Sequence, residues 1–209
     1  MFEYVSKTKY SSVRSELEDI IKNVQDELRG EITFRFDLIG SGSKKLITQE
    51  IGSSKGFDFD YNLVLQQGAF DFTAKEIRDK FMDAFKKALK GTKYNNPSSS
   101  KSAITIKVVD QENSLIKHSC DFGIVREILD DNDDLRNEIN IFDKPSNHIW
   151  NIRAKSNNYA DKAKEIKEDG LWQDLRDEYL DLKNNNNDEE KKSYQLYLEA
   201  INNIYNQNY

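Results

Sequence analysis

The sequence has very little cysteine and histidine. Its 209 residues include one cysteine, Cys120, and two histidines, His118 and His148. One cysteine cannot form a disulfide bond within the chain, and this small set excludes a zinc site built from cysteine and histidine. We therefore expect a protein of a reducing compartment, the cytoplasm.

Long apolar runs are also missing. The first residues, MFEYVSKTKY, lack an apolar stretch of the length found in signal peptides. No run approaches the ~18 apolar residues of a membrane span, so we expect no association with a membrane. The net charge of −6 disfavours non-specific binding to duplex nucleic acid, because neutralising phosphates requires a basic surface.

What the sequence does contain indicates a folded domain with a heavily solvated surface. Charged residues make up 33% and hydrophobic residues 37%, and 11% of the chain is aromatic. The aromatic side chains supply apolar area for a core despite the high polarity. A chain of this length is sufficient for one core, or for a core with a small appendage.

The hydrophobic pattern predicts mixed elements first and helices last. Three- and four-residue spacing predicts a helix over 13–28, and a capping box of Thr73 and Glu76 opens a second helix over 73–90. Alternating patterns predict strands over 31–39, 57–65, 103–109 and 114–125, and a hairpin within 139–152. Helices are expected over 159–168, 171–183 and 188–205. We therefore predict an α+β fold, with a mixed sheet and its helices in residues 1–155 and a helical lobe, 156–209, packed on that core.

Two acids alternate along the predicted strand 57–65. The two-residue period places Asp58, Asp60 and Asn62 on one face, and the opposite face carries Phe59, Tyr61, Leu63 and Leu65. Two neighbouring carboxylates on a sheet repel each other and lose hydration. A divalent cation makes such a pair tolerable, which indicates a metal site, although an edge strand with a solvated face would show the same local pattern.

A third acid occurs in the predicted strand 114–125. Asp121 shares a face with Ser119 and Lys117, whereas His118 and Cys120 lie on the opposite, core-like face. If this strand joins the same sheet with its acid on the same side, three carboxylates converge. Carboxylates together with substrate phosphates are the usual ligands of Mg²⁺. Ser119 and Lys117 are then candidates for substrate contact.

A glycine-serine turn follows the predicted strand 31–39. Gly40, Ser41, Gly42 and Ser43 offer close backbone approach, N–H groups and hydroxyls to an anion, and Lys44 and the lysine after it add positive charge. This spacing fits neither a Walker A loop nor a dinucleotide fingerprint. The turn is therefore a candidate binding site for the phosphates of a nucleotide, while the lysines could also be ordinary loop charges.

The order of these motifs resembles the DNA polymerase beta-like nucleotidyltransferase superfamily. The residues that carry the resemblance are Leu38-Ile39-Gly40-Ser41-Gly42-Ser43 and Gly56-Phe57-Asp58-Phe59-Asp60. They are similar to the branch that holds oligoadenylate synthases, cyclic GMP-AMP synthase and its bacterial relatives. The resemblance covers roughly residues 10–125.

This resemblance implies a role for each motif. Asp58 and Asp60 would bind Mg²⁺ or Mn²⁺, Asp121 would complete the site and help to activate an attacking hydroxyl, and the turn at 40–44 would bind nucleotide phosphates. The implied activity is transfer of a nucleoside monophosphate from a nucleoside triphosphate to a hydroxyl, with release of pyrophosphate.

The acceptor stays open at this point. It could be a nucleotide, an RNA end, a small molecule or a protein side chain. The alternative function is a catalytically silent module that binds a nucleotide or regulates a defence or toxin-antitoxin system. The intact set of three acids favours the enzyme over this alternative.

A basic run lies beside the predicted helix 73–90. Lys86, Lys87, Lys90 and Lys93 could contact nucleic acid, but most such runs are solvated helix faces. We therefore expect a solvated face here.

Overall fold

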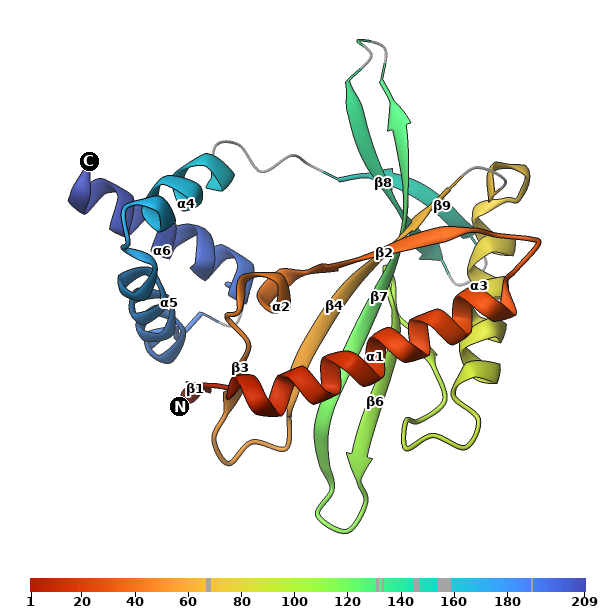
Figure 1. Cartoon of the computed structure of the whole chain (residues 1–209), viewed down its shortest axis with the longest axis horizontal. Coiled ribbons are helices and arrows are strands. Elements are labelled where there is room, and N and C mark those ends of the chain that lie inside the picture. The colour runs from red at the N-terminus through yellow and green to blue at the C-terminus, as the bar shows by residue number, and fades with distance from the viewer. Residues whose placement is uncertain (67–68, 131, 133, 145–146, 154–158, 189) are drawn as a thin grey trace. The chain divides into compact units, whose positions relative to one another are not determined.

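The computed structural model of the chain describes residues 1–66, 69–130, 132, 134–144, 147–153, 159–188 and 190–209. Two compact units make up the chain. One is Tyr4–Arg153, and the other combines Met1–Glu3 with Ala154–Tyr209 (Figure 1). The predicted packing of a lobe 156–209 onto a core 1–155 stays a prediction, and each unit is described by itself.

A seven-stranded mixed sheet organises the larger unit. Its strands follow the order β2-β4-β7-β6-β5, and β8 and β9 extend from β7. Only the pair β4 and β7 is parallel, and the other pairs in this sheet are antiparallel. The bounds are β2 Phe34–Ile39, β4 Phe57–Leu65, β5 Ser98–Ser99, β6 Ile104–Asp110, β7 Leu115–Leu129, β8 Leu135–Lys144 and β9 Asn147–Ile152.

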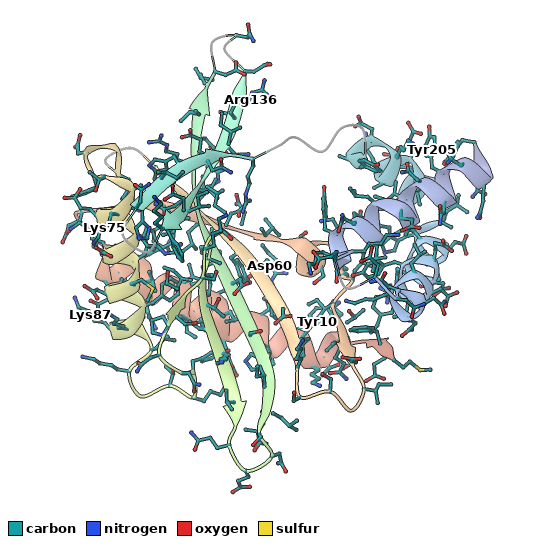
Figure 2. All side chains as sticks on the ribbon, turned by 180° about the vertical axis from the view of Figure 1, so that it is seen from behind. Tyr10, Asp60, Lys75, Lys87, Arg136 and Tyr205 are labelled. Atoms are coloured by element: carbon teal, nitrogen blue, oxygen red, sulfur yellow. The ribbon has the colours of Figure 1, made fainter. Side chains whose placement is uncertain are left out.

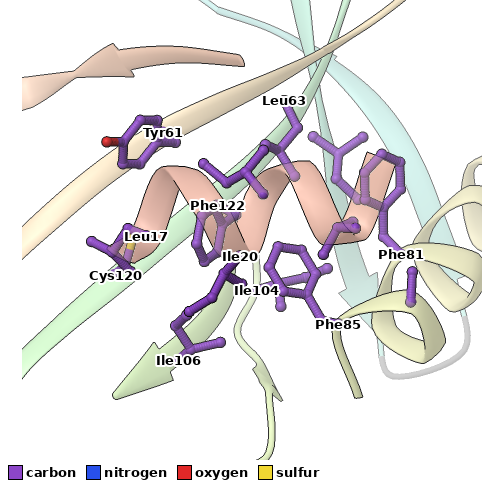
Figure 3. Close-up of a cluster of buried hydrophobic side chains, with 14 of the residues drawn as sticks. Leu17, Ile20, Tyr61, Leu63, Phe81, Phe85, Ile104, Ile106, Cys120 and Phe122 are labelled. Carbon is purple, nitrogen blue, oxygen red and sulfur yellow. The ribbon is translucent and has the colours of Figure 1, made fainter. Parts of the chain in front are cut away.

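Two helices pack on one face of this sheet. They are α1 (Lys7–Glu27) and α3 (Ala74–Ala88), which opens on the predicted capping box of Thr73 and Glu76. The buried cluster between sheet and helices is drawn in Figure 3, and its labelled members are Leu17, Ile20, Tyr61, Leu63, Phe81, Phe85, Ile104, Ile106, Cys120 and Phe122. Burial of this apolar surface drives the layer to form.

The apolar layer determines which side chains occupy the other face. Phe57, Phe59 and Tyr61 of β4 are nearly fully buried beneath α1 and α3. Successive side chains of a strand point to opposite faces, so the residues between these aromatics lie on the face away from the two helices. Figure 2 views the sheet from behind relative to Figure 1 and labels Asp60 on β4.

Several predicted elements differ in their bounds or type. The turn after β2 is a short helix, α2 (Gly40–Lys44), because the chain closes one helical turn before Lys45 adopts a left-handed conformation, with φ of 58°. Strand β2 begins at Phe34, later than predicted. The sequence pattern also missed the short strands β1 (Phe2–Tyr4), β3 (Thr48–Glu50) and β5, which are too brief to show a period. A 3₁₀ turn, Ala69–Asp71, precedes α3.

Three helices are found among the described residues of the smaller unit. They are α4 (Tyr159–Glu168), α5 (Trp172–Asn185) and α6 (Ser193–Asn208), so the last helix begins later than the predicted residue 188. The amide of Asn184 accepts a hydrogen bond from the Phe2 backbone N–H and donates one to the Phe2 carbonyl oxygen, which ties the N-terminal residues to this unit.

Within the described ranges, none of the helices combines the length and the apolar character that crossing a membrane requires.

Candidate active site

The three predicted acids lie on one face of the sheet, on its two central strands. Asp60 of β4 and Asp121 of β7 are direct partners in the parallel ladder, and Asp58 is the partner of Ser119 two positions earlier. The alternation of both strands turns these side chains away from the helices α1 and α3. Residues 61 positions apart in the sequence, Asp60 and Asp121, thus share one rung of the sheet.

Hydroxyl groups donate hydrogen bonds to two of the three acids, Asp121 and Asp58. Thr105 of β6 is the strand partner of Asp121, and its Oγ1 donates a hydrogen bond to Asp121 Oδ1 over 2.5 Å. Ser119 of β7 donates a hydrogen bond to Asp58 Oδ1. Hydrogen bonds to ionised oxygens fix the rotation of each carboxylate and leave its second oxygen for another partner.

The electrostatics of this face disfavour three bare negative charges. Burial, together with the charges of Asp121 and Asp58, raises the pKa of Asp60 to about 6, and the charges of Arg153 and Lys44 oppose this shift. Partial loss of water also raises the pKa of Asp121, and the charge of Asp58 adds to this effect. The face therefore gains stability from any cation that enters it.

The glycine-serine turn lies directly beside Asp60. Gly40 has a φ of 61°, and a Cβ atom built on it would stand 2.5 Å from Asp60 Oδ2. Only glycine satisfies both the backbone conformation and this approach. The Gly40 carbonyl oxygen accepts hydrogen bonds from Ser43 Oγ over 3.0 Å and from Lys44 Nζ over 3.2 Å.

The other residues of the turn are partly or fully withdrawn from solvent. Gly42 is buried against Leu38 and Phe59, and Ser41 is half-buried, with its carbonyl oxygen accepting the Leu46 N–H. Lys44 is half-buried as well, and burial lowers its pKa while the charge of Asp60 opposes that shift. The Lys44 side chain thus places a positive charge beside Asp60.

A second cation lies on the same face, beside the residue two positions beyond Asp60 on β4. Arg153, directly after β9, donates from Nη1 to Asn62 Oδ1 over 2.9 Å. Its Nη2 would stand 3.3 Å from a Cβ atom on Gly123, so the missing side chain at Gly123 leaves room for the guanidinium. Asn62 and Gly123 are strand partners two positions along the ladder from Asp60 and Asp121, so this group lies on the same face of the sheet as the acids.

The structure thus brings Asp58, Asp60 and Asp121 onto one face, with the turn at residues 40–44 beside Asp60, and it adds other residues. Lys117, a candidate for substrate contact, instead lies 3.3 Å from Asp110. Thr105 and Arg153 were not predicted, and Asn62 was predicted on the acid face without a role. Thr105 could have been placed on the acid face from the sequence, because Thr105 and Lys107 alternate with the buried Ile104 and Ile106. No local sequence pattern indicates a role for Arg153, because its contact with Asn62 joins two residues far apart in the chain.

The donor set of this face fits a divalent cation of the magnesium type. Among the described residues, no three acidic, histidine or cysteine side chains form a ready-made cage for one ion. Mg²⁺ seldom uses such a cage, since it is usually held by one or two carboxylates together with substrate phosphates and water. Asp58, Asp60 and Asp121 offer those carboxylates, and the space kept free by Gly40 adjoins Asp60 Oδ2.

The fold matches those of solved nucleotidyltransferases. No protein-family model matches the sequence, and no curated protein matches it significantly. The dinucleotide cyclase DncV of Vibrio cholerae, solved with ATP and GTP, superposes with a TM-score of 0.57 at 14% identity over 97% of this chain and 55% of that one. The c-di-GMP synthase CdnE of Capnocytophaga granulosa gives a TM-score of 0.57 at 17% identity over 99% and 64%. The CD-NTase CdnG of Bradyrhizobium diazoefficiens, solved with GTP, gives 0.53 at 14% over 76% and 42%.

These matches identify an architecture. The chain spans between 42% and 64% of the length of these three proteins, so it corresponds to part of each of them. The mixed sheet, the helices packed on it and the C-terminal helices agree with the predicted fold class. The chain therefore shares the fold of the CD-NTases, the cyclic GMP-AMP synthase-like branch of the DNA polymerase beta-like nucleotidyltransferases.

Proposed function

We propose that this chain catalyses a metal-dependent nucleotidyl transfer. A nucleoside monophosphate passes from a nucleoside triphosphate to an acceptor hydroxyl, and pyrophosphate is released. The observation that carries the proposal is the rung formed by Asp60 and Asp121, with Asp58 on the same face and the turn at Gly40 directly beside Asp60.

The carboxylates form the centre of the proposed reaction. Asp58 and Asp60, with Asp121, would hold Mg²⁺ or Mn²⁺, which neutralises negative charge on the triphosphate and favours in-line displacement at phosphorus. Asp121 accepts the proton of the acceptor hydroxyl. The acceptor oxygen forms a bond to the α-phosphorus as the bond from that phosphorus to the bridging oxygen breaks, and pyrophosphate carries away the electron pair.

The flanking groups would bind the substrate. The backbone and hydroxyls of residues 40–43 hold the outer phosphates, and Lys44 adds positive charge to them. Arg153 provides the second cation of the face. Because these groups are fixed by the sheet and by the short helix α2, most of the catalytic effect comes from positioning and charge compensation.

The nucleotides bound in the structural neighbours indicate which donor this chain would use. DncV and CdnG were solved with ATP or GTP bound, which supports a purine nucleoside triphosphate as the donor here. The acceptor is a second nucleotide, an RNA end, a small molecule or a protein, and a cytoplasmic location accords with this nucleotide chemistry.

Isosteric variants of the acids test the activity. We expect wild-type protein with Mg²⁺ or Mn²⁺ and each nucleoside triphosphate to release pyrophosphate, and Asp60→Asn and Asp121→Asn to lower the rate by about a hundredfold or more, because each removes a charge needed at the reaction centre. A coupled pyrophosphate assay measures the rate, and the mass of the product identifies the acceptor.

Asp37→Asn is the matched control. Asp37 is a carboxylate of the neighbouring strand β2, the strand partner of Asn62, and it lies 3.4 Å from the Arg35 guanidinium. Its change should leave the rate within about threefold, a loss of less than 1 kcal/mol. Nucleotide binding without turnover under any of these conditions would instead favour the catalytically silent module.

A further inference from the structure

Thr105 contacts the acid face through its hydroxyl group. It lies on β6 between Ile104 and Ile106, both fully buried on the opposite face, so the alternation of the strand directs Thr105 toward the acids. In an antiparallel pair, directly opposite residues have neighbouring Cβ atoms. The register pairs Thr105 with Asp121, and the hydroxyl donates to Asp121 Oδ1 over 2.5 Å.

The folding of β6 does not require this hydroxyl. Thr105 is half-buried and Asp121 is exposed, so water is available to both groups if the bond is broken. Valine has the same shape and an equal or higher preference for strands. The polar atom therefore makes its specific contribution at the carboxylate of Asp121.

The effect of the bond on Asp121 is geometric. The Thr105 hydroxyl has one proton, which it donates to Oδ1, and this contact restricts rotation of the carboxylate. Ser119 makes the equivalent contact with Asp58 Oδ1, two positions earlier in the ladder of β4 and β7. In metal sites, ligating carboxylates are themselves held by such hydrogen bonds, which orient the oxygen that faces the ion.

We propose that Thr105 is a positioning residue of this site, which holds Asp121 so that its Oδ2 atom is presented to the metal ion and to the acceptor hydroxyl. The inference rests on the proposed function. It gives strand β6 a role in the reaction, because Thr105 orients Asp121 without itself contacting the reacting atoms.

The test is the affinity of the protein for Mn²⁺ without nucleotide. Free Mn²⁺ is measured by electron paramagnetic resonance as it is titrated into the wild type, Thr105→Val and Thr105→Ser. Thr92→Val is the matched control, since Thr92 is exposed outside the site and its Oγ1 donates to the Leu89 carbonyl oxygen. Circular dichroism verifies that each variant is folded, and Thr105→Ala replaces any valine variant that is not.

The expected result is a loss of Mn²⁺ affinity of about tenfold or more in Thr105→Val, with Thr105→Ser and Thr92→Val close to the wild type. In the pyrophosphate assay, Thr105→Val should lower kcat by a similar factor with little change in KM for the nucleotide, because the phosphate-binding turn is untouched.

Two results overturn the inference. One is a Thr105→Val protein that binds Mn²⁺ within about twofold of the wild type. The other is a wild type that binds no Mn²⁺, since Asp121 would then have no ion to face. A wild type that binds Mn²⁺ but releases no pyrophosphate contradicts the proposed function alone, and the Mn²⁺ affinities still decide the role of Thr105.

Discussion

At the scale of single residues, Gly40 and Asp60 constrain each other. The positive φ of Gly40 ends β2 and begins α2, and the missing Cβ leaves space for Asp60 Oδ2. An L-residue in this conformation costs about 1–2 kcal/mol even in open space. Here the side chain would also displace the carboxylate at the centre of the proposed site.

Gly40→Ala should therefore reduce both stability and activity. Gly52→Ala is its matched control, because Gly52 has a similar φ of 73° with no atom within 4 Å of a built Cβ. We expect Gly52→Ala to lose about 1–2 kcal/mol of unfolding free energy and Gly40→Ala to lose more, and only Gly40→Ala to lose most of its pyrophosphate release. Urea unfolding and the coupled assay measure the two effects. Full activity in Gly40→Ala would show that Asp60 tolerates displacement.

At the scale of elements, the alternation of β7 places its acidic residue and its buried residues on opposite faces of the sheet. Asp121 faces the acid side, whereas His118 and Cys120 are buried on the helix side. His118 Nε2 shares a hydrogen bond of 3.0 Å with Tyr94 Oη, and Tyr94 Oη donates to Glu16 of α1 over 3.4 Å. This buried chain of contacts links the central strand to the helix that covers it.

The same contacts predict a pH dependence of stability. Burial, with a smaller contribution from the charge of Lys93, lowers the pKa of His118 from 6.5 to about 4, and the charge of Glu16 opposes this shift. The unfolded state therefore binds the proton more readily than the folded state between these values. The stability contributed by neutral His118 is complete above about pH 6.5 and is lost as the pH falls toward 4.

Urea unfolding at several pH values measures this term. Between about pH 7 and pH 4.5 the wild type should lose roughly 2 kcal/mol more than His118→Gln, whose side chain does not titrate. Equal pH slopes for the two proteins would show that His118 is protonated as easily in the folded state as in the unfolded one.

Helix α3 supports the strand that carries Thr105. Arg78 of α3 is 1% exposed, and its guanidinium donates to Ser99 Oγ and to the carbonyl oxygens of Ser100 and Ala103. Burial lowers its pKa to about 10, so it remains charged at neutral pH. These bonds fix the connection that leads into β6, and hence the position of Thr105 over Asp121.

At the scale of the whole molecule, the charge distribution disfavours duplex nucleic acid. The net charge is −6, and three of the four lysines of the basic run are paired with acids. Lys86 lies 2.9 Å from Asp83, Lys87 lies 3.2 Å from Glu27, and Lys93 lies 2.7 Å from Glu16. The run is therefore a solvated surface with its own counter-charges, and exposed pairs of this kind add little stability.

We expect no saturable binding of a duplex of about 20 base pairs at physiological salt, with any affinity weaker than about 10⁻⁴ M. Fluorescence anisotropy of labelled DNA or RNA measures it. Replacing the partners with Glu16→Gln and Glu27→Gln should strengthen binding at low salt, because the lysines lose their counter-charges. Micromolar binding by the wild type that weakens steeply with salt would contradict this prediction.

Much of the fold was predictable because its patterns are local. The capping box at Thr73 and the alternation of 57–65 are confirmed, since each depends on neighbours in the chain. The helical turn at 40–44 was not predicted, because it depends on how the chain packs beside Asp60. Strand β2 starts later than predicted because Glu31 and Ile32 donate their backbone N–H groups to the Leu28 carbonyl oxygen, in the turn after α1. The hairpin of β8 and β9 was predicted with its first strand starting too late.

The sequence by itself determined which side chains share a face, through the two-residue period of β4 and β7 and the aromatics that one face must bury. It left undetermined which strands are neighbours. Only the tertiary structure decided that β4 and β7 lie parallel with Asp60 opposite Asp121, that Thr105 reaches Asp121, and that Arg153 reaches Asn62. The physical reason is that pairing between distant segments is decided by the joint burial of their apolar faces against α1 and α3, which no short stretch of sequence encodes.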